Sequence, residues 1–287
     1  MTEAEQQDLA YERAVLEAWR DPALRAIVVR GFLHEDVFEA LRAFAASEDW
    51  ARIRRLLHAA GVRPPARVLD LGGGRGLVAA ALAQEGYEAV LCEPNPSEVC
   101  GAGAASRLRA RLAAPFTIAT GAVGALEVEG FDAVVCRAVL HHVQPLDEVL
   151  RDILSLLVPG GVFIASDEPT VQRAADLALA RARHPFAGFG VEEDAHPVAH
   201  YLQALVAAGF AGARARFPVA FGDYRRYVRP LPRLLALPFY ARYRLRARLR
   251  PRPGQVVSLV ARRPAQGATP VTHETVGDRT CAPRARF

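Results

Sequence analysis

The sequence predicts an α/β fold with a doubly wound, mostly parallel sheet that follows an N-terminal helical cap. Short apolar segments alternate with helical segments after the Pro64-Pro65 pair, and strands that alternate with helices form parallel β-α-β units. A glycine-rich turn, "GGGRG" at 72–76, follows the first apolar segment directly. We expect the last strand of the sheet to run antiparallel to the others.

The cap is expected over residues 1–62. From about residue 4 to residue 61, apolar side chains recur at helical intervals, and the pair Pro64-Pro65 ends this region. The positions that carry the periodicity are Leu9, Ala14, Val15, Trp19, Val37, Leu41, Phe44, Ile53, Leu56 and Leu57.

The main domain is expected over residues 63–263. Its strands are predicted at 67–71, 88–92, 116–119, 132–136, 161–166 and 256–261. Its helices are predicted at 77–84, 96–109, 146–157 and 198–208, the last of them closed by Gly209.

An insertion interrupts this domain at about 221–253. Within it, "RYRLRARLR" at 242–250 alternates basic and mostly apolar residues, which favours an edge strand over a helix. The pattern suits a solvated face better than a surface for anionic lipid or a polyanionic substrate, although peripheral lipid contact stays open. From residue 264 to 287 the chain is polar and aperiodic, and we expect a disordered tail.

Composition excludes several classes of function. All 36 basic residues are arginine, so mechanisms that need a lysine Schiff base or a Walker A lysine are ruled out. Such uniform arginine use reflects a compositional bias, and we discount it as evidence for nucleic-acid binding. The acidic first residues do not resemble a secretory leader, no apolar run is long enough to cross a bilayer, and the four cysteines are widely spaced. These features predict a cytoplasmic protein.

The glycine turn has the spacing Asp70-x-Gly72-x-Gly74-x-Gly76. A dinucleotide-binding turn needs Gly-x-Gly-x-x-Gly, and here the third position is Leu77. The third glycine and the helix N-terminus serve a pyrophosphate, so the spacing indicates a ligand without phosphate at this place.

This pattern resembles motif I of the class I methyltransferases that use S-adenosylmethionine (SAM), in particular the small-molecule type related to quinone methyltransferases. The resemblance extends over about 62–169 and includes Glu93 after the second strand, "GFDAVVCRAVLHHV" and "LVPGGVFIASDEP". It implies a Rossmann-like fold and SAM as the cofactor.

The resemblance also implies which residues hold the cofactor. Asp70 organises its amino end, the glycines at 72, 73, 74 and 76 pack along it, and Glu93, followed by Pro94, binds the ribose hydroxyls. Many relatives hold adenine with a Gly-Asp pair after the third strand, where this chain has Gly121-Ala122. Adenine contact is therefore expected from Ala122 and Val123. The glycines of the turn are Gly72, Gly73, Gly74 and Gly76, and the remaining cofactor residues implied are Arg137 and Ala138.

Histidines after the fourth strand are the candidate general bases. The pair His141 and His142 lies where the substrate edge is expected, and similarity to a Leu-Glu-His-Val segment of the family favours His142. His196 is a second candidate, because this segment forms a lid over the acceptor in related enzymes. Either Asp167 or Glu168, after the fifth strand, is expected to bind an acceptor hydroxyl.

No metal site is predicted. Some quinone methyltransferases carry glutamates where this chain has Ala138 and His141, so the ligand set is depleted. The spacing of His196 and His200 can bind metal, but Pro197 and the acidic residues Glu192, Glu193 and Asp194 favour a capped helix start.

The leading hypothesis is methyl transfer to a small-molecule acceptor, at a hydroxyl oxygen of a glycan, a lipid-linked compound or a secondary metabolite. One alternative is an RNA or protein methyltransferase, against which the chain lacks the Asn-Pro-Pro-Tyr type of motif and any RNA-binding module. A second alternative is a SAM-binding protein without activity. The sequence does not predict the oligomeric state.

Overall fold

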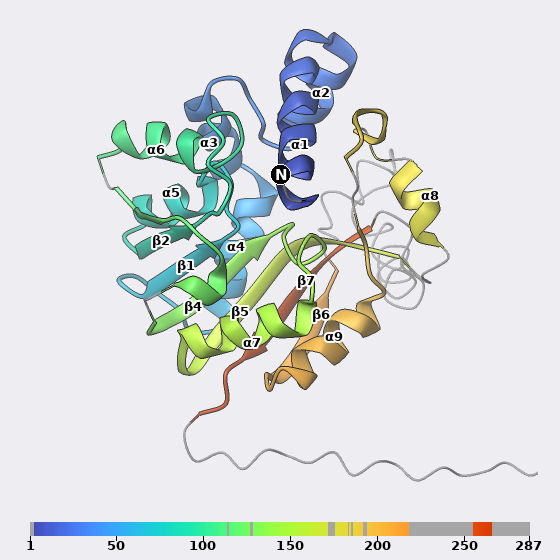
Figure 1. Ribbon diagram of the computed structural model, residues 1–287. Helices are drawn as coiled ribbons and strands as arrows, with labels where there is room; N and C mark the ends of the chain where they lie inside the picture. Colours follow the sequence, from blue (N-terminus) through green and yellow to red (C-terminus); the bar gives the residue numbers. More distant parts are fainter. Residues whose placement is uncertain are drawn as a thin grey trace, which may run out of the picture.

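Seven strands form a single sheet in the order β3-β2-β1-β4-β5-β7-β6 (Figure 1). The computed structural model describes residues 3–113, 115–126, 129–171, 176–182, 184, 186–191, 194–217 and 255–265. The strands are β1 (Arg67–Leu71), β2 (Glu88–Cys92), β3 (Thr117–Ala119), β4 (Phe131–Arg137), β5 (Leu157–Thr170), β6 (Ala211–Arg216) and β7 (Gln255–Arg262). Only the ladders that involve β7 are antiparallel among those described. The predicted fold class is confirmed.

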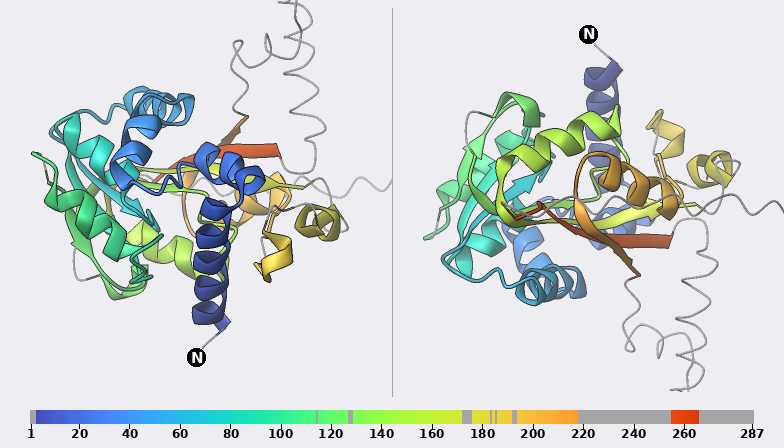
Figure 2. Two further views of the ribbon diagram at one scale, coloured as in Figure 1. Left: turned by 90° about the horizontal axis from the view of Figure 1, so that it is seen from above. Right: turned by 90° about the horizontal axis from the view of Figure 1, so that it is seen from below.

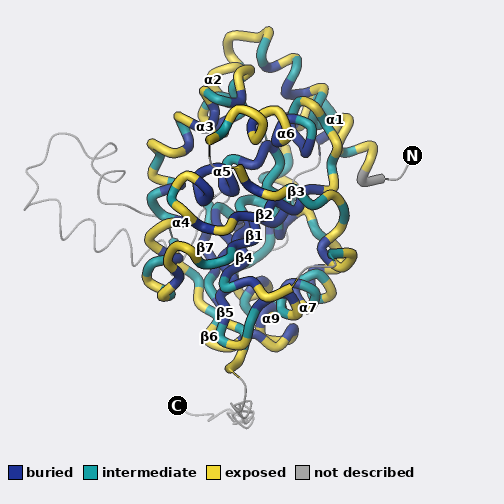
Figure 3. Tube along the Cα trace, turned by 90° about the vertical axis from the view of Figure 1, so that its left-hand side faces the viewer, coloured by how far each residue is buried: buried dark blue, intermediate teal, exposed yellow. Residues whose placement is uncertain are grey.

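Helices cover both faces of this sheet (Figure 2). They are α1 (Glu3–Arg20), α2 (Pro22–Arg30), α3 (Val37–Ala45), α4 (Glu48–Ala59), α5 (Leu77–Gln84), α6 (Ala102–Ala110), α7 (Leu146–Leu156), α8 (Leu177–Ala182) and α9 (Val198–Ala207), with the 3₁₀ turns η1 (Val123–Ala125) and η3 (Ala187–Phe189). Helices α3 to α6 pack on one face and α7 and α9 on the other, and the central strands are buried between them (Figure 3).

The predicted helical block at 1–62 divides between two packed clusters. Helices α3 and α4 contribute Phe44, Ile53 and other side chains to the core on one face of the sheet. Helices α1 and α2 instead pack around Val15 and Val28 against Phe186 and Val191, in a cluster of their own. These two helices lie beyond the arrowheads of the parallel strands, above the edge where the site is expected (Figure 1).

The helix predicted at 96–109 begins only at Ala102, with Gly101 at its N-cap. The side chains of Asn95 and Ser97 accept hydrogen bonds from backbone N–H groups at 97, 99 and 100. These bonds stabilise a loop in place of a first helical turn. The prediction of helix at 96–101 was wrong for this reason.

Two further differences concern strands. Strand β6 was not predicted, and β5 extends to Thr170, beyond the predicted end at 166. The predicted insertion at 221–253 and nearly all of the predicted tail lie outside the described residues. Within the part of the chain that is described, no helix combines the length and the apolar character needed to cross a membrane.

Candidate active site

The candidate site lies at the carboxyl ends of β1, β2, β4 and β5. From β1 the chain moves outward to β2 and β3, and then returns to place β4 on the other side of β1. In doubly wound sheets, ligands bind at the carboxyl edge where the strand order reverses in this way. The residues predicted to bind a cofactor come from these strand ends and the turns that follow them.

The turn after β1 needs glycine for two reasons. Gly72, Gly74 and Gly76 have φ values of 62°, 52° and 73°, which L side chains rarely adopt. A Cβ on Gly73 would lie 2.3 Å from Oδ2 of Asp70, and one on Gly74 would lie 2.9 Å from a backbone oxygen. The glycines therefore keep the turn packed closely against its neighbours, since Val139 and Asp70 occupy the space that side chains on Gly72 and Gly73 would need.

Asp70 lies under this turn and is fully buried. Its Oδ2 accepts a hydrogen bond from the backbone N–H of Ala79 at 2.9 Å, whereas Oδ1 has no hydrogen-bond partner among the described residues. Burial raises the pKa of Asp70 to about 7, against the effect of the Ala79 hydrogen bond. A buried carboxyl with an unused oxygen is suited to accept a hydrogen bond from a cationic ligand group.

Glu93 follows β2 and is 6% exposed. Its Oε2 accepts a hydrogen bond from the backbone N–H of Gly74 at 2.7 Å, and its Oε1 accepts one from that of Asn95 at 2.8 Å. Burial raises the pKa of Glu93, and these two bonds oppose the shift. The carboxylate thus joins the glycine turn to the loop after β2, while Pro94 next to it is exposed.

The predicted adenine contacts lie beside the end of β2. Ala122 is exposed and forms the N-cap of η1, and Val123 is buried against the face covered by α7. The thiol of Cys92 donates a hydrogen bond to the carbonyl of Gly121 at 3.3 Å. Ala122 is therefore placed to meet a ligand through its backbone and methyl group.

Arg137 and Ala138 end β4. The Arg137 side chain turns toward α4, where its Nη2 donates to Asp49 at 3.1 Å and its Nε lies 3.4 Å from Oδ2 of Asp167. Arg52 of α4 joins the same network through Asp49 at 2.7 Å and Asp167 at 2.5 Å. This four-residue ion-pair network ties α4 to the ends of β4 and β5.

His141 is buried and is paired with Glu168. Its Nδ1 lies 2.9 Å from Oε2 of Glu168, which is 0% exposed. The Glu168 carboxylate also accepts hydrogen bonds from the backbone N–H groups of Val139, Leu140 and His141, at 3.0, 3.1 and 3.3 Å. Because a carboxylate only accepts, Nδ1 carries the proton, and in the neutral imidazole Nε2 then carries the lone pair.

A β-bulge near the end of β5 determines which way Asp167 and Glu168 face. Ala165 pairs with Leu259 and Glu168 with Val257, so β5 has one residue more than β7 between these pairs. The extra residue moves Asp167 to the α4 face and Glu168 to the face of His141. Both predicted hydroxyl-binding acids are thus already engaged by other residues of the protein.

The other predicted bases lie near this pair. His142 is exposed, and its ring centroid lies 3.9 Å from that of His141. His196 is half-buried, its ring centroid lies 4.7 Å from that of His200, and its Nε2 has no hydrogen-bond partner among the described residues. Burial lowers the pKa of His196, and the neighbouring His200 lowers it further, whereas Asp194 raises it.

Of the acidic residues predicted to cap α9, the structure describes Asp194, and this residue does not cap the helix. Pro197 is the N-cap and no side chain caps the helix; Asp194 instead pairs with Arg181 of α8 at 2.5 Å. Glu192 and Glu193 lie outside the described residues. No group of three or more metal-ligating side chains is found within the described ranges.

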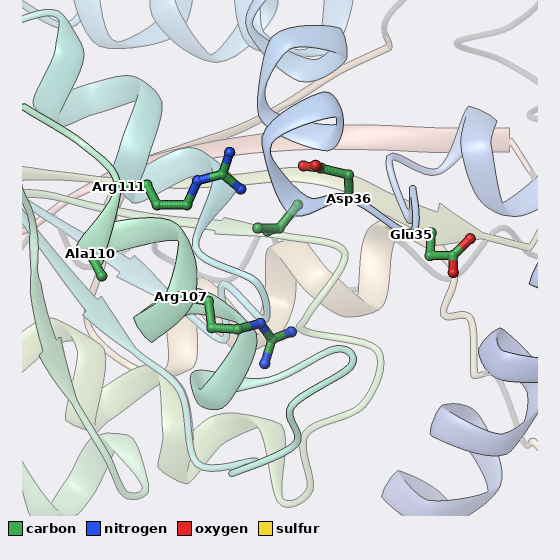
Figure 4. Close-up of a pocket in the computed structure, with 6 residues that line it drawn as sticks. Glu35, Asp36, Arg107, Ala110 and Arg111 are labelled. Carbon is green, nitrogen blue, oxygen red and sulfur yellow. The ribbon is translucent and has the colours of Figure 1, made fainter.

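A surface pocket of about 340 Å³ lies between the start of α3 and the end of α6 (Figure 4). Its charged lining residues are Glu35, Asp36, Arg107 and Arg111. Asp36 caps α3 and Arg107 pairs with Glu98, so both charges have partners within the protein. None of the predicted site residues lines this pocket.

Sequence analysis did not find several residues that support the site. Arg75, inside the glycine turn, is buried and donates to the carbonyl of His34 at 2.6 Å. Asn95 and Ser97 hold the loop after Glu93, and the Asn-Pro-Ser sequence is a turn signal that was available. For Arg52 and Asp49 the helical pattern gave no signal, because nothing in it shows which strand end a helix meets.

Comparison with known proteins adds a family model described as a methyltransferase domain, which matches residues 37–210. The chain is 32% identical over 122 residues to the ubiquinone biosynthesis O-methyltransferase of Xanthomonas campestris pv. campestris (strain B100), covering 42% of this chain and 51% of that protein. It is 34% identical over 118 residues to the demethylmenaquinone methyltransferase of Beutenbergia cavernae, covering 41% and 47%. The chain thus spans about half the length of the curated relatives it matches.

Among solved structures, the magnesium protoporphyrin IX methyltransferase of Synechocystis PCC 6803 with bound SAH is similar, with a TM-score of 0.52 and 20% identity. The match covers 82% of this chain and 92% of that one. At this identity the similarity concerns the fold, and it agrees with the sheet described above.

Proposed function

The chain belongs to the methyltransferase domain family, and from this premise we propose that it transfers a methyl group from SAM to a hydroxyl oxygen of a small molecule. The observation that carries the proposal is Glu93, a buried carboxylate bound to the amide of Gly74 at the end of β2. A carboxylate at this position can accept two ribose hydroxyl protons, and the glycine turn beside it leaves room for a nucleoside.

The residues at the strand ends fit SAM. Asp70 offers an unused, buried oxygen for a cationic group, and the residues at 72, 73 and 74 add no side chain of their own to the turn. Ala122 offers backbone groups for adenine, and Arg137 and Ala138 complete the edge at β4. When bound, SAM supplies an electrophilic methyl group on a sulfonium centre.

We assign the proton-accepting role to His141. Glu168 fixes its orientation and its Nδ1–H tautomer, so that Nε2 is the basic nitrogen that would accept the proton of an acceptor hydroxyl. The similarity of the sequence favoured His142, but that side chain is exposed, whereas His141 is buried against Glu168. His142 and His196 are assigned to acceptor contact beside His141.

The choice of a small-molecule hydroxyl follows two arguments. The relative from Xanthomonas is named as an O-methyltransferase of ubiquinone biosynthesis, which is a small-molecule pathway. A histidine held by a buried carboxylate is the arrangement that deprotonates a hydroxyl near neutral pH. The proposed acceptors are hydroxylated small molecules, a class that includes phenols, quinols and glycans.

Binding is tested by calorimetric titration of the purified protein with SAM and with its product S-adenosylhomocysteine (SAH). We expect saturable binding of both, and loss of at least about 1.4 kcal/mol of binding free energy, a tenfold rise in Kd, in Glu93→Ala. Absence of binding to the wild-type protein contradicts the cofactor assignment. Release of SAH with a panel of phenols, quinols and glycans then tests the acceptor class, and turnover only with amines or thiols contradicts a hydroxyl acceptor.

A further inference from the structure

Helix α1 contacts the loop that carries Glu93, although α1 lies outside the residues that the family model matches. The family model begins at residue 37, whereas α1 spans Glu3–Arg20. The hydroxyl of Ser97 donates a hydrogen bond to Oε2 of Glu12 on α1 at 2.5 Å, across 85 residues of sequence.

From Ser97 a continuous series of hydrogen bonds leads to the glycine turn. The backbone N–H of Ser97 donates to Oδ1 of Asn95 at 2.8 Å, and the N–H of Asn95 donates to Oε1 of Glu93 at 2.8 Å. The other oxygen of Glu93 accepts from Gly74 at 2.7 Å. The Glu12 carboxylate therefore stands at the outer end of a series whose inner end is the proposed ribose contact.

A second acid of α1 contacts the same loop. Burial raises the pKa of Asp8, which lies one helical turn before Glu12, and the nearby side chain of Asn95 lowers it. Two consecutive turns of one helix face thus meet residues 95 and 97, which is the spacing expected of a docked helix face.

Helix α1 is fixed on its other side as well. Tyr11 packs edge-on against Phe186, with ring centroids 5.7 Å apart, and Val15 belongs to the same apolar cluster as Val191. The segment at 186–191 follows α8 and leads toward His196. Helix α1 thereby bridges the loop of Glu93 and the segment that leads to the acceptor side.

We propose that Glu12 and Asp8 are positioning residues of the cofactor site, which hold the loop at 93–100 so that Glu93 is preorganised for the ribose. This inference rests on the proposed function. Preorganisation contributes to affinity because an ordered loop loses less conformational freedom on binding. By thermodynamic linkage, bound cofactor in turn stabilises the docked position of α1.

Calorimetric titration with SAH tests the proposal on Glu12→Ala. We expect Kd to rise about tenfold, which is the loss typical of one charge-assisted hydrogen bond. Glu17→Ala is the matched control, because Glu17 lies on the same helix but forms only an exposed pair with Arg20. Both variants make the same Glu-to-Ala change in a helix, so a helix effect would appear in both.

A double-mutant cycle with Ser97→Ala separates positioning from general destabilisation. If Glu12 acts through Ser97, the double variant binds SAH about as weakly as Ser97→Ala alone, whereas independent effects add. In turnover assays we expect KM for SAM to rise while kcat at saturating SAM stays within about twofold, since only cofactor binding is affected.

Hydrogen exchange gives the reciprocal readout. SAH is expected to slow amide exchange in α1 of the wild-type protein and to have less effect in Glu12→Ala. Wild-type protein that fails to bind SAH overturns the proposed function, and the inference with it. Wild-type protein that binds SAH while Glu12→Ala binds equally well overturns the inference alone.

Discussion

Nδ1 of His141 lies 2.9 Å from Oε2 of Glu168, and both side chains are almost completely removed from solvent. The acid also accepts the backbone N–H groups of the turn that carries the histidine, so ring and turn are held by one carboxylate. Fixing the proposed general base in this way lowers the entropic cost of reaching the reactive geometry. It also determines which ring nitrogen bears the proton.

The first prediction concerns this tautomer. Nitrogen-15 NMR of the histidine side chains is expected to show His141 protonated on Nδ1 near neutral pH, and Glu168→Gln is expected to remove that preference. Once an acceptor is identified, kcat of Glu168→Gln is expected to fall by a factor of about 10²–10⁴, which is the usual contribution of a general base.

Asp167→Asn is the control for this variant. Asp167 is the adjacent acid, but it faces Arg52 and Arg137 and has no contact with His141 among the described interactions. An unchanged His141 spectrum is therefore expected. If Glu168→Gln leaves the Nδ1–H tautomer in place, the positioning role of Glu168 is contradicted.

The second prediction is a pH dependence of cofactor affinity that originates at Asp70. Burial raises the pKa of Asp70 to about 7 in the free protein, and a cationic cofactor group favours the ionised form. Below that pKa, binding must remove a proton from Asp70, so the affinity attributable to Asp70 rises with pH up to about neutrality.

The measurement is the Kd of SAM between pH 6 and pH 8 for the wild-type protein and for Asp70→Asn. The ratio of the two affinities isolates Asp70 from titration of the ligand itself, and it is expected to grow with pH by no more than about tenfold per unit. A pH-independent ratio contradicts the role of Asp70.

The same pKa predicts the sign of a stability effect. Between the ordinary pKa of 3.8 and about 7, the folded protein retains a proton on Asp70 that the unfolded chain has lost. The contribution of Asp70 to the free energy of unfolding therefore falls as pH rises through this window. Chemical denaturation at several pH values should show the wild-type protein losing stability relative to Asp70→Asn as pH rises from about 4 to about 7.

Much of the sheet could be predicted because its strands are buried apolar runs bounded by turn residues. Strands β1 and β2 and helix α5 were placed with their observed bounds. Strand β6, "AGARAR", escaped prediction because it is short, exposed and rich in small and charged residues, so its periodicity is weak. It forms because β7 offers it a partner, which no local pattern reveals.

The directions of the side chains at the site were harder to predict. Sequence analysis placed Asp167 and Glu168 at the right strand end but assigned both to the acceptor, because a bulge of one residue has no signature in "ASDEP". Glu93 was identified from its position after the second strand, whereas the contact of its loop with α1, between Ser97 and Glu12, comes from a distant segment. Local pattern identifies the residue type, and tertiary packing determines its partner.

The third prediction tests the space beside the glycine turn. Gly73→Ala places a methyl group 2.3 Å from the Asp70 carboxylate, so the free energy of unfolding is expected to fall by about 1–3 kcal/mol and SAH binding to be lost. Gly188→Ala is the control, because nothing lies within 4 Å of the added carbon. Wild-type affinity in Gly73→Ala contradicts the packing described here.

The fourth prediction concerns the ion pair between Arg52 and Asp167, whose side chains are 15% and 11% exposed. Arg52→Met removes one of the two positive charges that neutralise the carboxylates of Asp49 and Asp167. We therefore expect the free energy of unfolding to fall by about 3 kcal/mol. Arg55→Met, on the same helix, breaks an exposed pair with Glu48 and is expected to cost less than about 1 kcal/mol. In a cycle with Asp167→Asn, urea denaturation should give a coupling energy of about 0.5–3 kcal/mol, because both groups share one network. Equal effects of the two arginine variants would show that α4 is not held to the strand ends by these charges.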